Sequence, residues 1–581
     1  MNFFHGEKYR GAVDKKEENC YNIFNETRHN ILYIGTCMRA CEGQRMKKKL
    51  SKRRIKWIER TVANDRSNKQ FLYGRFFLFL LLAVAQLVGY VFLWYLLTYY
   101  TAVGVFIQIA VSVLSLVMIL YLINKNDRPS IKLNWIIVIL IVPVFGVPAY
   151  LLYGEKRPTK LMNRFILKAK EENKCYCQTA YAERKAFTAQ TREESICYYL
   201  ERHADYPVFH DGDVEYFESG EKMFPQMLAE LQKAEKYIFV EYFIIAHGKM
   251  WGEILKILLE KAALGVKVRI IYDDFGCMMT LPPDYDRYLE SLHENIRCMT
   301  FNDIIPFVAV RMNNRDHKKV LVVDGKVAFT GGVNLADEYI AEKKRFGYWK
   351  DTGIKVTGNA VGSFVKMFLY MWNAFRADKE KIEEYLLPYQ AEAPRKEGEP
   401  LRCIQPYDDS PFDEVSVAES VYLDMIHRAQ KYLYIFTPYL LIDDSVRTAL
   451  CQAARRGVDV RIVTPGIPDK KLVYRLTRAN YGILMKAGIR IYEYTPGFIH
   501  AKSMVCDDEY AVVGTINLDY RSLYFHFENA VYFTDPTAVT ALKRDAEETF
   551  AVSKLCTPEN TKRTPIGRLC DTLLRVFETL F

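Results

Sequence analysis

The sequence lacks the cysteine patterns that build zinc sites or disulfide scaffolds. Its 581 residues include 13 cysteines, an odd number scattered along the chain, and no paired CxxC motifs. Structural zinc sites need such paired ligands, and small secreted domains need regularly spaced cysteines. The composition therefore favours a reducing compartment and predicts no cysteine-based metal site.

Charged residues are absent from two long apolar runs near the front of the chain. The first extends from Phe76 to Leu97 and the second from Ala102 to Ile123, with a short polar stretch between them. Each run has the ~20 apolar residues that a helix needs to cross a bilayer. Residues 71–124 are therefore predicted to form a transmembrane helical hairpin, and the basic residues on both flanks place those flanks in the cytoplasm.

A third apolar run, at residues 133–154, is interrupted by Pro143, Gly146 and Pro148. Because basic residues lie on both sides of it, a re-entrant or interfacial helix is favoured over a third membrane span. Residues 1–70, before the hairpin, are predicted to form a polar and then basic N-terminal tail. This topology places the rest of the chain on the cytoplasmic side.

The rest of the chain carries an internal repeat. Ala429 lies 195 residues after Ala234, and Gly457 lies 192 residues after Gly265. Each pair occupies the same place in a pattern of helix followed by β-branched strand. The repeat predicts an α/β fold in two tandem copies, at residues 190–380 and 400–560, joined by an irregular linker.

Each copy contains one HxKxxxxD motif. The first reads HKKVLVVD from His317 to Asp324, and the second reads HAKSMVCD from His500 to Asp507. In both copies a Gly-Gly or Gly-Thr pair follows, and an asparagine lies 17 residues after the histidine. The motif predicts a buried strand on which the histidine and the lysine point to one face. The small residues after it predict a turn that brings backbone amides close to a ligand.

An imidazole, an ammonium group and an amide on one face suit a phosphodiester. The lysine offsets charge on the nonbridging oxygens, and the imidazole acts as nucleophile or as general acid and base. One such face is half of a site. Two faces that meet across a pseudo-twofold axis place the two histidines on opposite sides of one phosphorus atom, as in-line displacement requires.

The duplicated motif, HKKVLVVD and HAKSMVCD, resembles that of the phospholipase D superfamily over roughly residues 200–555. With the apolar segments before it, the chain most resembles the bacterial cardiolipin synthase family. The resemblance implies two α/β/α sandwich repeats in one pseudo-twofold catalytic unit, and a phosphohistidine-type intermediate formed without a metal or other cofactor. Two positions depart from the family pattern, since Gly353 and His526 stand where a histidine and an asparagine are common.

The resemblance also implies a role for each site residue. His317 would attack the phosphorus, and His500 would protonate the departing glycerol and later deprotonate the acceptor hydroxyl. A later carboxylate would hold the imidazole of its own copy, Asp351 in the first and Glu528 in the second. The other candidates would hold the phosphate oxygens or order the site: Lys319, Lys502, Asn334, Asn517, Thr515, Asp324 and Asp507.

Three functions remain open at this point. The first is cardiolipin synthesis from two phosphatidylglycerol molecules, with release of glycerol. The second is phosphodiester hydrolysis, as in a phospholipase D or a nuclease, because the same motifs permit water as acceptor. The third is a catalytically inactive, membrane-anchored lipid-binding protein, which the completeness of both motifs argues against. The net charge of +10 suits lipid headgroups and nucleic acid alike. The predicted membrane hairpin favours phosphatidylglycerol and other anionic lipids over nucleic acid, and it predicts a location in the bacterial cell membrane.

Overall fold

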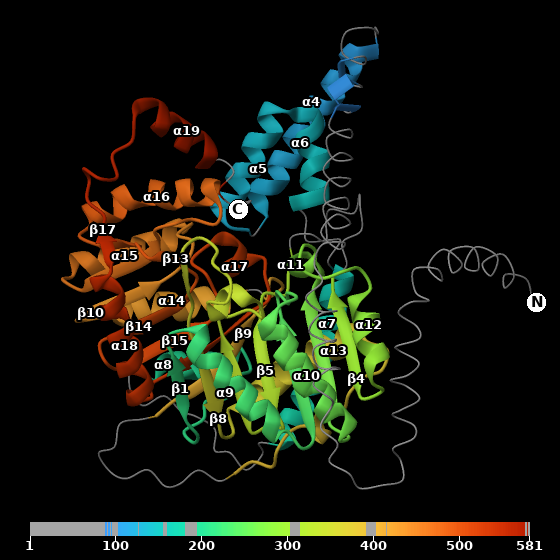
Figure 1. Ribbon diagram of the computed structural model, residues 1–581. Helices are drawn as coiled ribbons and strands as arrows, with labels where there is room; N and C mark the ends of the chain where they lie inside the picture. The colour runs from blue at the N-terminus through green and yellow to red at the C-terminus, as the bar shows by residue number, and fades with distance from the viewer. Residues whose placement is uncertain are drawn as a thin grey trace, which may run out of the picture. The chain divides into compact units, whose positions relative to one another are not determined.

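The computed structural model describes residues 88–89, 91–92, 94–95, 103–125, 127–154, 160–180, 194–302, 314–390, 402–413, 415–575 and 578 (Figure 1). All of these residues belong to one compact unit, Glu59–Phe581. The predicted tail at residues 1–70 and most of the first predicted membrane run lie outside the described residues.

Several helices precede the two copies. They are α4 (Val103–Asn124), α5 (Pro129–Ile141), α6 (Pro143–Ala149), the π-helical turn η1 (Tyr150–Gly154) and α7 (Lys160–Ala180). The third apolar run is thus broken after Ile141, where Pro143 begins a new helix and cannot continue the previous one. None of the helices in the described ranges combines the length and the apolar character that crossing a membrane requires. The transmembrane hairpin is therefore not confirmed, and the re-entrant segment stays a prediction.

The first copy folds around a mixed sheet of seven strands in the order β1-β8-β6-β5-β2-β3-β4. Its strands are β1 (Val214–Phe217), β2 (Tyr237–Tyr242), β3 (Lys267–Asp273), β4 (Ile296–Phe301), β5 (Lys319–Val323), β6 (Val327–Gly331) and β8 (Gly353–Thr357). Strands β2, β3 and β4 run parallel, whereas β5 runs antiparallel to β2. Its helices are α8 (Ser195–His203), α9 (Gly220–Lys233), α10 (Lys249–Ala263), α11 (Asp274–Cys277), α12 (Tyr285–Leu292), η4 (Asp337–Ile340), α13 (Val361–Phe375) and η5 (Ile382–Glu384).

The second copy has a sheet of eight strands in the order β17-β12-β11-β10-β14-β15-β16-β9. They are β9 (Ile404–Asp409), β10 (Tyr432–Phe436), β11 (Asp459–Pro465), β12 (Arg490–Tyr494), β14 (Ser503–Cys506), β15 (Tyr510–Gly514), β16 (Glu528–Phe533) and β17 (Ser553–Leu555). The helices are α14 (Val417–Arg428), α15 (Asp444–Arg455), α16 (Lys471–Lys486), α17 (Tyr520–Tyr524), α18 (Pro536–Ala551) and α19 (Pro565–Arg575). Apart from β17, the order repeats that of the first sheet read from β4 to β1. The predicted α/β fold in two matching copies is therefore confirmed.

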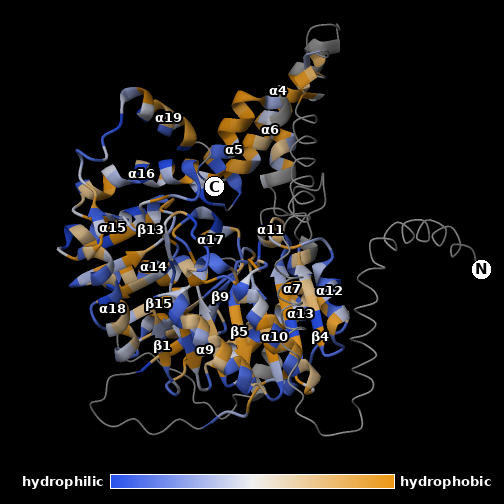
Figure 2. Cartoon of the chain, in the orientation of Figure 1, coloured by the Kyte–Doolittle hydropathy of each residue, from blue (hydrophilic) through white to orange (hydrophobic). Residues whose placement is uncertain are grey.

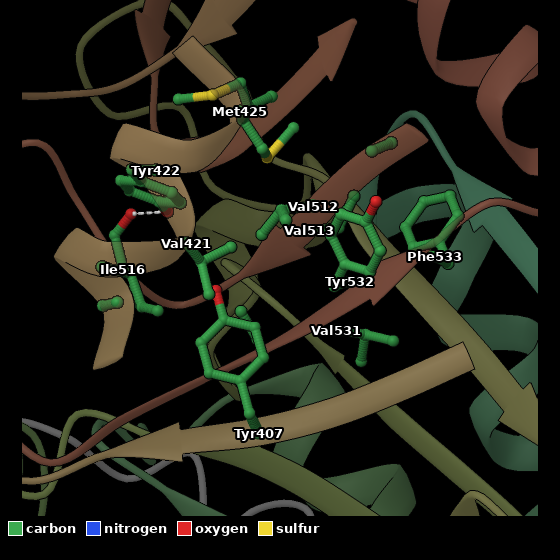
Figure 3. Packing of buried hydrophobic residues seen from close by; sticks show 14 of the residues in the cluster. Tyr407, Val421, Tyr422, Met425, Val512, Val513, Ile516, Val531, Tyr532 and Phe533 are labelled. Atoms are coloured by element: carbon green, nitrogen blue, oxygen red, sulfur yellow. Dashed lines mark hydrogen bonds between the residues drawn. The ribbon is translucent and has the colours of Figure 1, made fainter. Parts of the chain in front are cut away.

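Two helices at the interface between the copies each pack on both sheets. Helix α13 packs on β2, β5 and β6 of its own sheet and also on β9 of the second sheet. Helix α18 packs on β10, β12, β14 and β15 of its own sheet and also on β1 of the first sheet. Figure 3 shows the core of the second copy, where Val421 and Met425 of α14 lie near Val513 and Tyr532. Strands buried on both faces explain the nearly unbroken apolar runs in the motifs.

Short strand pairings also join the copies. Strand β7 (Tyr348–Lys350) of the first copy runs parallel to β13 (Gly497–Ile499) of the second, with Lys350 opposite Ile499. A single parallel bridge joins Asp316 to Phe527 in the mirrored position. Parallel pairing keeps the following residues side by side, so these two contacts set the geometry of the site.

Candidate active site

His317 follows one of these bridges and is held by the second copy. Its backbone amide donates to the carbonyl oxygen of Phe527 at 2.8 Å. Its Nδ1 lies 2.8 Å from Oε2 of Glu528, the residue after Phe527. The Thr515 hydroxyl donates to the same carboxylate oxygen. The imidazole is thus fixed through Nδ1, which leaves Nε2 as the nitrogen available to a substrate.

His500 is held by the first copy in the same way. Its backbone amide donates to the carbonyl oxygen of Lys350 at 2.7 Å. Its Nδ1 lies 2.6 Å from Oδ2 of Asp351, the residue after Lys350. The rings of Tyr339 and Trp349 pack against the His500 imidazole, each with its centroid 5.6 Å away.

The pairing of histidines with carboxylates corrects the expectation from the sequence. Glu528 was expected to hold His500, and Asp351 was expected to hold His317. Each carboxylate instead holds the histidine of the other copy. The reason is the parallel bridging between the copies, which sets the residue after Phe527 beside His317 and the residue after Lys350 beside His500.

The motif lysines lie beside the histidines. Nζ of Lys319 donates to the His317 carbonyl oxygen at 2.6 Å, and Nζ of Lys502 donates to the His500 carbonyl oxygen. Both lysine side chains are buried. An ammonium group has three donor hydrogens, so each lysine keeps donors for phosphate oxygens.

Burial and like charge shift the pKa values of all four groups. Burial, with the ammonium groups of Lys319 and Lys502, lowers the pKa of His317 well below its usual 6.5. Burial and Lys502 lower the pKa of His500 to about 4, although Asp351 opposes the shift. Burial also lowers the pKa of Lys319 to about 7 and that of Lys502 to about 8. Both imidazoles are therefore neutral near pH 7 in the free site. The negative charge of a bound phosphodiester would favour protonation of one imidazole, and the positive charge on that one would keep the other neutral.

These pKa values predict that kcat/KM for a phosphodiester falls as the pH rises. The active forms of Lys319 and Lys502 are the ammonium forms, which are lost through pKa values of about 7 and about 8. His500, whose pKa is about 4, is mostly neutral throughout this range, and the small fraction that is protonated falls further as the pH rises. We expect a fall of at least about tenfold between about pH 7 and pH 9, measured in mixed micelles. Lys502→Arg, which stays charged, should make the alkaline fall shallower, and a kcat/KM that rises with pH would contradict the prediction.

The motif aspartates lie at the far end of the motif strand from the histidines. The Asp324 carboxylate accepts hydrogen bonds from the backbone amides of Glu235, Lys236 and Tyr237, at 2.7–2.8 Å. Asp507 accepts three equivalent bonds in the second copy, from residues 430–432. Each aspartate thus fixes the turn that leads into the central strand, β2 or β10. This placement agrees with an ordering role and gives these carboxylates no contact with the histidines.

Removal of this carboxylate is expected to affect stability more than chemistry. Asp324→Ala leaves three backbone amides without their acceptor, and each such loss costs about 1–3 kcal/mol. We expect the Tm of the full chain to fall by at least about 5 °C, measured by scanning calorimetry. Asp324→Asn, which keeps an acceptor oxygen, should lose less. A variant with wild-type Tm and a hundredfold lower kcat would instead place Asp324 in the chemistry.

The asparagines after the motifs tie the surrounding loops together. Oδ1 of Asn334 accepts from the Ile244 amide at 3.1 Å, and its Nδ2 donates to Oη of Tyr339 at 2.6 Å. Nδ2 of Asn517 donates to Oγ of Ser522 at 3.0 Å. Asn334 therefore positions the tyrosine that packs on His500, and direct contact of either amide with a phosphate stays a prediction.

The small residues after each motif direct their backbone amides to carbonyl oxygens of the protein, whereas they were expected to direct them to a ligand. The amide of Gly332 donates to the Thr352 carbonyl at 2.9 Å, and that of Thr515 donates to the Asn529 carbonyl at 2.9 Å. The expectation that these amides face a ligand is therefore wrong. A Cβ atom at Gly332 would collide with the Asp351 carboxylate, so glycine makes room for the residue that holds His500.

His526 is a site residue whose importance the sequence did not reveal. Its ring centroid lies 5.5 Å from that of His317, and its Nε2 accepts from Nε of Arg521 at 3.3 Å. Burial lowers its pKa to about 3. The ligand atoms of His317, His526 and Glu528 lie within 4.8 Å of one another, a spacing that a metal ion can bridge. Such an ion would compete with the His317–Glu528 hydrogen bond and with the bond from Arg521.

A buried charge cluster behind the first motif was also missed. Nζ of Lys318 lies 2.7 Å from Glu241 and 3.0 Å from Asp316, and all three side chains are buried. Apolar residues occupy the matching places in the second copy, with Ala501 in place of Lys318 and Phe436 in place of Glu241. The one signal in the sequence was the charged residue between the histidine and the lysine of HKKVLVVD.

Comparison with known proteins agrees with this geometry. The family described as "Cardiolipin synthase, PLD-like domain" matches residues 227–346 and 422–550, one segment in each copy. The family described as "Phospholipase_D-nuclease N-terminal" matches residues 113–155. An uncharacterized protein of Streptococcus mutans is 43% identical over 453 residues, which cover 77% of this chain and 96% of that protein.

Proteins named cardiolipin synthase are also similar over most of the chain. The one from Geobacillus kaustophilus is 32% identical over 470 residues, covering 78% of this chain and 90% of that protein. The one from Listeria innocua is 33% identical over 436 residues, covering 73% and 88% respectively. The chain therefore belongs to the phospholipase D superfamily, among its cardiolipin synthase-like members.

Proposed function

We propose that the protein is a cardiolipin synthase, which transfers a phosphatidyl group from one phosphatidylglycerol to a second and releases glycerol. The observation that carries the proposal is the pair of histidines, each held at Nδ1 by a carboxylate of the other copy. Two buried lysines beside them supply positive charge for one phosphodiester. Relatives named cardiolipin synthase, at 32–33% identity, support the choice of substrate.

In the first step, Nε2 of His317 attacks the phosphorus of the donor lipid. The phosphorus–oxygen bond to the glycerol headgroup breaks, and His500 gives its proton to the departing oxygen. Glu528 stabilises the positive charge that develops on the His317 imidazole, as a carboxylate does for a catalytic histidine. Lys319 and Lys502 offset the charge on the nonbridging oxygens. The products are free glycerol and a phosphatidyl group bonded to His317.

In the second step, a headgroup hydroxyl of the second phosphatidylglycerol attacks the same phosphorus. His500, now neutral, takes the hydroxyl proton, and the phosphorus–nitrogen bond breaks. The electron pair of that bond returns to His317, so both histidines recover their starting forms. Asp351 keeps the His500 imidazole in one tautomer and orientation through both proton transfers.

Hydrolysis is the second candidate, because water could replace the acceptor alcohol. Burial of the histidines supports the alcohol, since His317 and His500 are only 7% and 8% exposed. Aromatic rings add to this shielding, with Phe243 4.8 Å from the His317 ring centroid and Trp349 beside His500. A shielded site favours an acceptor that binds to the protein over bulk water.

The decisive experiment follows both products from one substrate. The purified full chain is incubated in mixed micelles with phosphatidylglycerol that carries radiolabel in its glycerol headgroup. Equal amounts of cardiolipin and free glycerol would support the proposal, and excess glycerol should then convert cardiolipin back to phosphatidylglycerol. Phosphatidic acid with glycerol, and no cardiolipin, would mean that water is the acceptor. Absence of any product from the wild type would overturn both enzyme assignments.

A further inference from the structure

Helix α19 presents its apolar face away from the protein. Ile566, Leu569 and Leu573 follow one another at spacings of three and four residues, which sets them on one side of the helix. Their exposed fractions are 76%, 61% and 59%. These three side chains are called the apolar stripe below.

The opposite, polar face of α19 makes the contacts with α16. Asp571 is buried and forms an ion pair with Arg475. Nη2 of Arg475 also donates to the carbonyl of Gly567 at 2.9 Å, and Nη2 of Arg575 donates to the carbonyl of Ala479 at 2.8 Å. A helix on the surface of a globular protein normally buries its apolar side and exposes its polar side. The reversed orientation of α19 indicates that its apolar stripe has a partner of its own.

The charges on α19 and just before it favour an anionic partner. Asp571, the one acidic residue of α19, is turned inward and also lies 3.6 Å from Arg563. The exposed charged residues on α19 and in the segment just before it are the basic Lys562 and Arg568 and the acidic Glu559, so positive charge is in excess. An exposed apolar stripe on a helix whose exposed charges are mainly basic is typical of a helix that lies in the interface of a membrane with anionic lipids.

A second apolar surface lies next to α19. Leu574 of α19 packs against a buried cluster that includes Val473 and Tyr520. The Tyr520 hydroxyl is also hydrogen-bonded to Ser130 of α5. Helix α5 consists largely of hydrophobic residues (Figure 2). It exposes large apolar side chains of its own, including Ile141, which is 72% exposed. Tyr520 thus connects α5 to the cluster on which α19 packs, and it begins α17, the helix that precedes His526 and Glu528 in the chain.

We propose that α19 is an interfacial helix that docks this catalytic unit on an anionic lipid surface. The apolar stripe enters the acyl region, and Lys562 and Arg568 lie among the headgroups. The helix holds the polar contacts of Asp571 and Arg575 against α16 at the same time, so docking fixes the orientation of the second copy toward the lipid. The inference concerns membrane contact and does not require the transfer reaction.

The test uses the full chain reconstituted in lipid discs. One set of discs contains phosphatidylglycerol and phosphatidylcholine, and the other contains phosphatidylcholine alone. Hydrogen exchange is measured at the backbone amides of residues 565–575. We expect exchange to be at least about tenfold slower in the anionic discs than in the neutral discs, with the difference reduced by high salt.

Matched variants separate docking from a general loss of apolar surface. The triple variant Ile566→Ser, Leu569→Ser and Leu573→Ser should lose the protection. The control is Leu472→Ser with Ile483→Ser on α16, which are 51% and 41% exposed and should behave as wild type. Equal exchange in both discs would overturn the proposal, and so would protection in detergent that grows with protein concentration, which indicates a second copy as the partner. Hydrogen exchange does not depend on catalytic turnover, so this result can be interpreted even if the proposed reaction does not occur.

Discussion

Alanine at His317 is expected to lower kcat for phosphatidyl transfer by at least about 10⁴-fold, because it removes the nucleophile and the covalent route with it. Alanine at His500 is expected to cost about 10²–10⁴-fold, as the loss of a general acid and base does. The measurement is the initial rate of cardiolipin formation in mixed micelles. His427→Ala, on the exposed side of α14, is the matched control and should leave the rate unchanged.

The same experiment identifies the histidine that carries the phosphatidyl group. Wild-type protein is quenched at high pH during turnover of phosphatidylglycerol that carries radiolabel in its phosphate, and the labelled peptide is then mapped. Label on the peptide that contains His317 would confirm the assigned roles. Label on His500 would exchange the two roles and keep the two-histidine mechanism. Unchanged rates in both alanine variants would end that mechanism.

The second large effect concerns the carboxylates that hold the histidines. Glu528→Gln and Asp351→Asn are each expected to lower kcat by about 10²–10⁴-fold, because an amide stabilises the wrong tautomer and no imidazolium charge. The pairing across copies predicts more than this loss. Glu528→Gln should fail in the way His317→Ala fails, and Asp351→Asn in the way His500→Ala fails.

A substrate with an activated leaving group distinguishes variants that have lost nucleophilic attack from variants that have lost proton transfer. A phosphatidyl ester of p-nitrophenol releases a stable anion, which needs no proton from His500. The burst of p-nitrophenol should therefore recover to within about tenfold of wild type in His500→Ala and in Asp351→Asn. It should stay low in His317→Ala and Glu528→Gln. Recovery in Glu528→Gln together with His500→Ala would show that the carboxylates act within their own copies.

Local patterns in the sequence were enough to predict the two copies and the motif strands. The apolar runs inside HKKVLVVD and HAKSMVCD indicate buried strands, and the repeated spacing indicates one fold used twice. The ordering role expected of Asp324 agrees with its hydrogen bonds to a turn at the other end of its strand. These features depend on short stretches of chain and on the period of a strand.

The contacts between the copies could not be predicted in this way. The partner of His317 is 211 residues away, and the bridge that brings Glu528 to it consists of one backbone pairing. No periodicity marks such a contact, and the order of residues suggested a partner within each copy. The need for glycine at position 332 could not be predicted either. The Asp351 carboxylate that fills the space beside it comes from a separate segment of the chain, and no local pattern marks that contact.

The exchange of carboxylates has a consequence for how the protein can be shortened and how it can evolve. Neither copy alone contains both a motif histidine and the acid that orients it, so a chain cut at residues 391–401 would yield two inactive halves. Mixed together, the halves should regain activity only as they reassociate, as in a split enzyme. The same arrangement suits descent from a symmetric homodimer, in which each subunit lent its acid to the other. After fusion the two acids became free to differ, and one is now an aspartate beside Gly332 and the other a glutamate beside Thr515.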